Sequence, residues 1–130
     1  MKRWSKSWKA STQPRKQRKY QKNLPLHRRK QLLSAALSKE LKQKHKKNTL
    51  AVRKGDTVKV MRGQFKTRTG KIVQVLPKRV RVFVEGVEQV KKDGSKALYP
   101  VHPSNLLLTE LALTDKRRQK ILLRTEKPHA

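Results

Sequence analysis

Apolar and polar residues alternate along the middle of the chain in the manner of short β-strands. In TVKVM, Val58 and Val60 are separated by a polar residue, and RVRVFV repeats the same two-residue period. Between them, KIVQVL also has the character of a strand. VEQVKK and KALYPV flank an Asp-Gly pair, which favours a hairpin. The pattern predicts a meander of short strands, and Pro100 restricts the last of them to a sheet edge or an exit loop.

Short strands joined by tight turns are typical of a small SH3-like barrel, and we predict one, with a hairpin extension, for residues 48–113. The fold class is therefore mainly β with flanking helices. Asp56, next to Gly55, is assigned to a turn. The predicted barrel core consists of aliphatic residues: Val58, Val60, Ile72, Val75, Val80, Val82 and Val84.

Before the strands, residues 25–47 carry leucines at a four-residue spacing, at Leu33, Leu37 and Leu41. The cations lie mostly on other faces, so the segment is predicted to be an amphipathic basic helical region. Ser38 followed by Glu40 favours a new helix start. One kinked helix and two short helices are both compatible with the pattern.

Residues 114–130 are predicted to form a short C-terminal helix and a tail. Thr114 or Asp115 can cap the helix, and the run Ile121 to Leu123 is expected to pack on the domain. The charged side chains of Arg117, Arg118 and Lys120 are expected to point into solvent.

Residues 1–24 are basic and contain almost no aliphatic side chains, so they cannot bury enough apolar surface to offset the entropy of ordering. We predict a basic extended arm that is disordered on its own. Trp4, Trp8 and Tyr20 interrupt it. These rings can stack on unpaired bases or dock on the protein's own domain, and the sequence favours neither.

Charge defines the class of partner. The chain carries 36 Lys and Arg against 8 Asp and Glu in 130 residues, a formal net charge of +28. Residues 1–54 hold 19 of these cations and a single acid, Glu40. Such a chain repels itself and requires a polyanionic partner.

Several classes of function are disfavoured. The chain has no cysteine, and its four histidines lack metal-ligand spacing, so we expect neither a metal site nor a cofactor. Glu85 and Glu88, the only close carboxylate pair, surround Gly86 in an expected turn with no cleft, so we do not expect an enzyme. No apolar run approaches the length of a membrane span, no secretory signal is evident, and a cytosolic location is expected.

The segment RGQFKTRTG interrupts the strands with a glycine-bracketed polar loop. Gly63 and Gly70 can adopt positive φ and allow close approach of another backbone. Cations surround them at Arg62, Lys66, Arg68 and Lys71. A strand on each side would fix the position of these charges, which a disordered arm would not.

The order of Gly55, Asp56, Val58, Val60, Gly63, Lys66, Gly70 and Ile72 resembles the KOW motif of ribosomal proteins and transcription elongation factors. Thr67 departs from it, because many such loops carry glycine there. The flanking segments PLHRRKQLLSAALSKEL, VFVEGV and VHPSNLLLTEL make the chain similar to the archaeal and eukaryotic form of the twenty-fourth universal large-subunit ribosomal protein family.

This resemblance implies a structural role in the cytoplasmic large ribosomal subunit, with neighbouring ribosomal proteins as partners and no self-association into a homo-oligomer. It implies binding to large-subunit rRNA near its 5′ region, support of subunit assembly and a position near the exit of the nascent-chain tunnel. The candidate rRNA-binding residues are Lys2, Arg3, Arg15, Lys16, Arg18, Lys19, Arg28, Arg29, Arg62, Gly63, Lys66, Arg68, Lys71, His102 and Ser104.

Two other functions compete with this interpretation. A KOW-type transcription factor would bind polymerase, but it is expected to have a partner domain and a less extreme charge. A histone-like DNA compactor, or a cationic protein of membrane surfaces, would explain the charge but not the glycine-bracketed loop.

Overall fold

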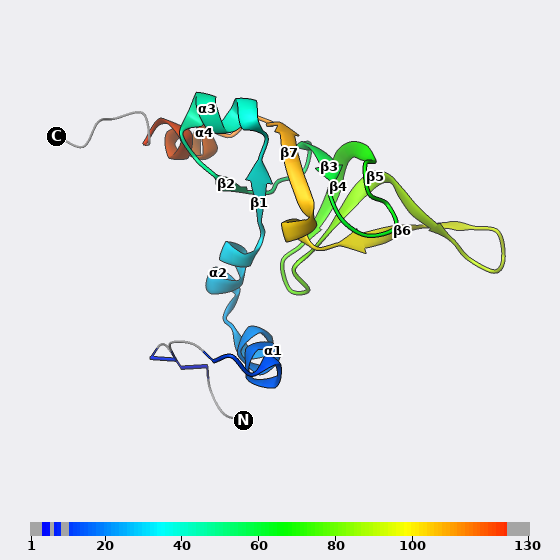
Figure 1. Cartoon of the computed structure of the whole chain (residues 1–130), viewed down its shortest axis with the longest axis horizontal. Coiled ribbons are helices and arrows are strands. Elements are labelled where there is room, and N and C mark those ends of the chain that lie inside the picture. Colours follow the sequence, from blue (N-terminus) through cyan, green and yellow to red (C-terminus); the bar gives the residue numbers. More distant parts are fainter. Residues whose placement is uncertain (1–3, 6, 9–10, 125–130) are drawn as a thin grey trace.

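A seven-stranded mixed sheet forms the centre of the computed structural model, which describes residues 4–5, 7–8 and 11–124 (Figure 1). The strands lie in the order β2-β1-β7-β3-β4-β5-β6, and β1 and β7 are parallel. The strand bounds are β1 Ser34–Leu37, β2 Thr49–Ala51, β3 Thr57–Val60, β4 Thr69–Leu76, β5 Arg81–Val90, β6 Lys96–Val101 and β7 Leu106–Glu110.

The sheet does not close, so the mainly β class is confirmed but the predicted barrel is not. The reason lies at the free edge of β3, where β7 pairs antiparallel with it and β1 then pairs with β7. Strands β7, β1 and β2 thus extend the sheet beyond β3, and β2 and β6 are its edges. Pro100 lies in β6, as predicted for an edge strand.

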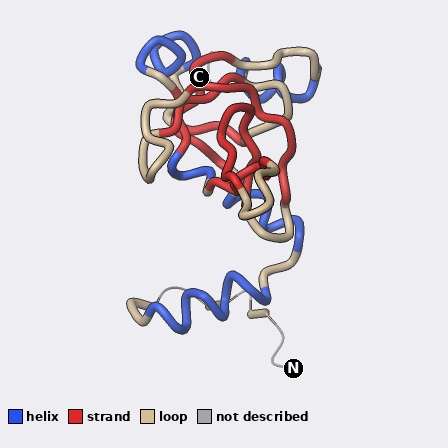
Figure 2. The backbone as a smooth tube through the Cα atoms, turned by 90° about the vertical axis from the view of Figure 1, so that its right-hand side faces the viewer, coloured by secondary structure: helices blue, strands red, loops and turns tan. Residues whose placement is uncertain are grey.

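Helices lie at two ends of the sheet. Helices α3 and α4 cover one end, whereas α1 lies beyond the other end and is joined to the sheet through α2 (Figures 1 and 2). The bounds are α1 Pro14–Asn23, α2 Leu26–Arg29, α3 Lys39–His45 and α4 Lys116–Leu123, with 3-10 turns η1 Lys30–Leu32 and η2 Pro103–Asn105.

The segment with the leucine spacing is a strand at its centre, so the predicted helix over residues 25–47 is wrong there. Leu33, Ala35 and Leu37 are buried, with Ser34 and Ala36 only partly so, which is the alternation of a strand. A four-residue spacing satisfies both periods, because positions i and i+4 also share a strand face. The cap at Ser38 is confirmed, since its hydroxyl accepts from the Leu41 backbone N–H and starts α3.

Part of the predicted extended arm is helical. Pro14 stands in the first turn of α1, where its fixed φ favours a helix. Lys, Arg and Gln have high helix propensity, which explains why this segment forms a helix although it lacks apolar residues. The Arg29 guanidinium holds the end of this helix, because Nη2 donates to the carbonyls of Lys22 at 2.9 Å and Leu24 at 3.0 Å.

The core lies along the sheet and is larger than predicted. Of the predicted residues, five are buried and Val75 and Val80 pack against them while partly buried. Leucines of β1, β2 and β7 add to this core at Leu37, Leu50, Leu106 and Leu108. Gly86 has φ +76° inside β5, where the β5–β6 register shifts, so it forms an irregularity within a strand and not the expected turn.

Asp56 is fully buried and forms an ion pair with Arg118 of α4, which is only 2% exposed. The Arg118 guanidinium donates to Oδ1 at 2.5 Å and to Oδ2 at 2.7 Å. The backbone N–H of Arg53 donates to Oδ2, and that of Ala112 to Oδ1, both at 2.9 Å. The prediction that Arg118 points into solvent is therefore wrong.

In α4, the prediction that three consecutive apolar residues pack on the domain holds for one of them. Leu122 is buried, whereas Ile121 is 37% exposed and Leu123 is 55% exposed. The helix begins as predicted, because the Asp115 carboxylate accepts from the Arg117 backbone N–H at 2.8 Å.

Replacing Asp56 by asparagine should lower the free energy of unfolding by about 3–5 kcal/mol, because it leaves the buried Arg118 charge without its partner. Denaturant unfolding of the purified protein measures this loss. The matched control is Asp93→Asn, which removes an acid from the exposed hairpin turn between β5 and β6 and should have a much smaller effect, because the amide oxygen can still accept the hydrogen bonds from Ser95. Equal effects of the two substitutions would show that the buried pair contributes no special stability.

Candidate nucleic-acid interface

The loop between β3 and β4, residues 61–68, is held to the sheet by a buried aromatic side chain and by hydrogen bonds. Phe65 is buried in the core, and the Thr67 N–H donates to the Val60 carbonyl at 2.9 Å. Arg62 and Lys66 are exposed on this anchored loop. The loop therefore presents its cations from a fixed backbone, as the sequence predicted for a loop between two strands.

The two bracketing glycines serve different purposes. Gly63 has φ +94°, and a Cβ there would meet nothing within 4 Å, so its requirement is conformational. A Cβ on Gly70 would lie 2.3 Å from the Glu85 carbonyl oxygen, so its requirement is the close approach of β5. Thr67, where related motifs carry glycine, has φ +75°, a conformation that β-branched residues rarely adopt.

The loop cations differ in whether their side chains bind other parts of the protein. Arg68 Nη1 donates to the Gly86 carbonyl at 2.8 Å, and its guanidinium lies 5.2 Å from the Phe65 ring centroid. Arg68 therefore joins the loop to β5. Lys71 is exposed on β4.

One groove adjoins the loop, and a second groove shares Arg81 and His102 with it. The first, of about 360 Å³, also has Arg62, Gly63 and Tyr99 in its lining. The second, of about 440 Å³, runs to α1 and holds further cations: Arg18, Lys22, Arg29, Lys78 and Arg79. We call the two together the basic channel. Among the described residues, no aspartate or glutamate lines either groove.

Arg29 has a structural role in this channel. Besides the carbonyls at the end of α1, its Nη1 donates to the Lys78 carbonyl at 2.7 Å. It thus ties α1 to the turn between β4 and β5, which points toward α1 in Figure 1. This bridge brings Arg18 and Lys22 to the same channel as Lys78 and Arg79.

The aromatic residues of the N-terminal segment pack on α1. Trp8 stacks on Tyr20 with 4.2 Å between ring centroids, and Trp4 lies tilted at 6.2 Å from the same ring. The Arg28 guanidinium lies 6.0 Å from the Trp4 ring centroid. Lys16 and Lys19 line the small cavity beside these rings, and Arg15 is exposed on the helix.

The remaining candidates divide between the channel and the undescribed terminus. Lys2 and Arg3 lie outside the described residues. Ser104 stands beside His102 in η2, and its hydroxyl lies 2.7 Å from His102 Nδ1. The Ser104 backbone N–H donates to the same nitrogen at 3.2 Å, so the histidine caps this turn in its neutral form.

The sequence interpretation missed the centre of the channel. Lys78, Arg79, Arg81 and Tyr99 were not among the candidate residues, although all line the grooves. The available signal was the alternation of arginine with valine in RVRVFV, which places cations on the face opposite the core. The local sequence gave no indication that this face of β5 lies beside Arg62 and α1 in the folded chain.

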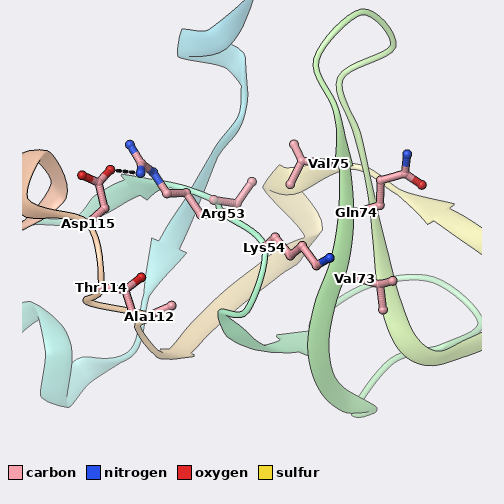
Figure 3. A pocket seen from close by; sticks show the side chains of 9 residues that line it. Arg53, Lys54, Val73, Gln74, Val75, Ala112, Thr114 and Asp115 are labelled. Atoms are coloured by element: carbon pink, nitrogen blue, oxygen red, sulfur yellow. Dashed lines mark hydrogen bonds and ion pairs between the residues drawn. The ribbon is translucent and has the colours of Figure 1, made fainter.

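A larger open cavity of about 760 Å³ lies elsewhere, between the segment before β3, β4 and the segment before α4 (Figure 3). Val52, Val73 and Val75 line it, and its one carboxylate, Asp115, is paired with Arg53. Within the described residues there is no cluster of three His, Cys, Asp or Glu that could hold a metal ion, and no helix suited to crossing a membrane.

Thr67→Gly should raise the free energy of unfolding by roughly 1 kcal/mol, because glycine relieves the left-handed strain of a β-branched residue. The control is Thr69→Gly, two residues further on in β4, which should lower it by about 0.5–1 kcal/mol, because glycine weakens a regular strand. Thermal unfolding of both variants gives the signs. A loss of stability in both would mean that the loop does not strain Thr67.

His102 should make stability depend on pH. Burial, and then the positive charge of Arg81, lower the pKa of His102 below the ordinary value of 6.5. As pH falls below 6.5, the unfolded chain takes up a proton at this residue before the folded chain does, so stability falls until the folded pKa is passed. The wild type should therefore lose more stability than His102→Asn over this interval in denaturant unfolding. Parallel pH profiles would contradict this.

A family model described as ribosomal proteins L26 of eukaryotes and L24P of archaea matches residues 11–125. This match covers most of the chain and includes the sheet, the loop, α1 and α4. The family is a structural, non-enzymatic part of the large ribosomal subunit in the cytoplasm, which implies rRNA and ribosomal proteins as partners. The chain belongs to this family of large-subunit ribosomal proteins.

Proposed function

We propose that this protein binds large-subunit rRNA near its 5′ region through the basic channel and the loop of residues 61–68. It supports assembly of the subunit, lies near the exit of the nascent-chain tunnel and acts as a single copy. The observation that carries the rRNA-binding proposal is the lining of the channel, where cations from α1, the β4–β5 turn and the loop converge and the described residues contribute no carboxylate. The 5′ region, assembly and tunnel exit rest on the family resemblance.

Phosphates are the ligands that this channel suits. Its seven arginine and lysine residues come from segments far apart in the sequence, which the fold brings together. Like charges held this close repel each other, and a phosphate backbone relieves the repulsion while releasing counterions. Arginine is also the side chain best shaped for paired hydrogen bonds to phosphate oxygens.

The role of the N-terminal candidates follows from α1. Arg15, Lys16 and Lys19 lie on a helix that carries Arg18 and Lys22 into the channel. RNA that follows the channel would pass along this helix, so these side chains extend the phosphate contacts. Trp4 and Trp8 pack on the Tyr20 ring of the same helix.

Replacing Lys78 and Arg79 together by alanine should weaken binding to large-subunit rRNA and reduce the slope of log affinity against log salt by about 2, roughly one unit per lost phosphate contact. Filter binding over a series of salt concentrations measures both quantities. The matched control is Lys116→Ala with Arg117→Ala, which removes the same charge from exposed positions of α4 at the other end of the sheet. Equal effects of the two double substitutions would mean that the overall positive charge attracts the RNA and that the channel does not bind it specifically.

The cellular counterpart is sedimentation of a native lysate through a sucrose gradient after a high-salt wash. The proposal expects the protein in the large-subunit peak, and expects the Lys78/Arg79 variant to be released at lower salt than the Lys116/Arg117 variant. Sedimentation of the wild type with polymerase or DNA, or only at the top of the gradient, would contradict the proposed function.

A further inference from the structure

The first groove of the basic channel contains an aromatic ring that is only partly covered. Tyr99 of β6 is 37% exposed, and its ring centroid lies 5.1 Å from that of Phe65 at an interplanar angle of 51°. Phe65 is buried in the core and cannot move freely. Tyr99 is therefore braced from behind by a fixed ring while part of its surface stays open to the groove.

The groove around this ring combines three kinds of chemistry. Arg62 and Arg81 supply positive charge, and the side-chain amides of Gln64 and Asn105 can donate and accept hydrogen bonds. Gly63 lines the same groove and contributes no side chain to it. The groove volume of about 360 Å³ falls in the range of sites for small molecules.

A nucleotide carries groups that match the ring, the amides and the arginines of this groove. Its base offers a flat π-face to an aromatic ring, its base edge offers donors and acceptors to amides, and its phosphate attracts arginine. An acidic peptide would satisfy the arginines but offers no flat face to Tyr99. Bases inside a duplex are covered by their neighbours in the stack, so only an unpaired base can present its face to the ring.

We infer that this groove binds one unpaired nucleotide of RNA, with its base stacked on Tyr99 and its phosphate held by Arg62 and Arg81. The inference rests on the proposed function and deepens it, since it assigns an unpaired nucleotide to one part of the channel. The flanking backbone continues into the second groove, because Arg81 and His102 line both. The loop of residues 61–68 thus fixes one wall of a nucleotide site besides presenting charge.

The experiment compares three synthetic RNA hairpins that differ at one position. One carries a single unpaired adenosine, one carries an abasic residue there, and one is fully paired. The full-length protein should bind the adenosine hairpin about 5- to 100-fold more tightly than the abasic one, as measured by fluorescence anisotropy. Tyr99→Leu, which keeps an apolar side chain against Phe65, should abolish this ratio without changing the affinity for the paired hairpin.

Two control variants separate stacking from general effects. Tyr99→Phe keeps the ring and should retain the preference for the adenosine hairpin. Leu98→Ala alters a neighbouring side chain of β6 that is equally exposed, at 37%, but lies on the other face of the strand, and should also retain it. With 2-aminopurine in place of the adenosine, wild-type protein should quench the fluorescence of the base, a readout that does not depend on how stably Tyr99→Leu folds.

The outcomes distinguish the inference from the proposed function. Equal binding of the three hairpins by the wild type, unquenched 2-aminopurine, or a preference that survives in folded Tyr99→Leu would overturn the nucleotide site and leave phosphate binding intact. Failure to bind any hairpin, or large-subunit rRNA, at low salt would overturn both.

Discussion

The buried ion pair between Asp56 and Arg118 joins parts of the chain that are 62 residues apart, and the arrangement of the sheet depends on it. Both carboxylate oxygens accept one guanidinium N–H and one backbone N–H, which offsets the cost of removing the charges from water. Arg118 also donates to the carbonyls of Ala51 and Ala112. This ion pair therefore joins four parts of the chain: the end of β2, the start of β3, the segment that follows β7, and α4. This is why a strongly basic chain keeps an acid in its glycine-bracketed segment.

Once the start of β3 is fixed, the interface follows from the sheet. The loop of residues 61–68 begins where β3 ends, Phe65 anchors it in the core, and Gly70 lets β5 approach β4 closely. The β4–β5 turn then reaches α1 through the bond of Arg29 to the Lys78 carbonyl. The fold gathers cations of distant segments along one channel, at a cost in mutual repulsion. A bound polyanion would remove that repulsion, so occupancy should stabilise the fold.

The Asp-Gly pair predicted the hairpin between β5 and β6, and the apolar character of KIVQVL predicted β4. Alternation of apolar residues predicted β3, the first part of β5 and the centre of the core, because a strict two-residue period fits a strand and does not fit a helix. It failed at β1, because leucines four residues apart fit a strand and a helix equally well, and at β7, because the consecutive leucines of LLLTE show no period. The burial of Arg118 was not predicted, because a charged side chain is expected to be exposed unless its buried partner, here Asp56, is known. Loop cations were predictable from the glycine-bracketed motif. The groove at Tyr99 was not, because it combines loop, β5, β6 and η2.

Lysine footprinting of the protein reassembled with large-subunit rRNA tests the central claim, that the basic channel is the RNA-binding surface. An amine-reactive reagent modifies lysines in the free protein and in the complex, and mass spectrometry compares each site. The account predicts that RNA protects Lys22, Lys66 and Lys78, which belong to the channel and its loop, while Lys116 and Lys120 of α4 remain reactive. Protection confined to α4, with the channel lysines as reactive as in the free protein, would contradict it.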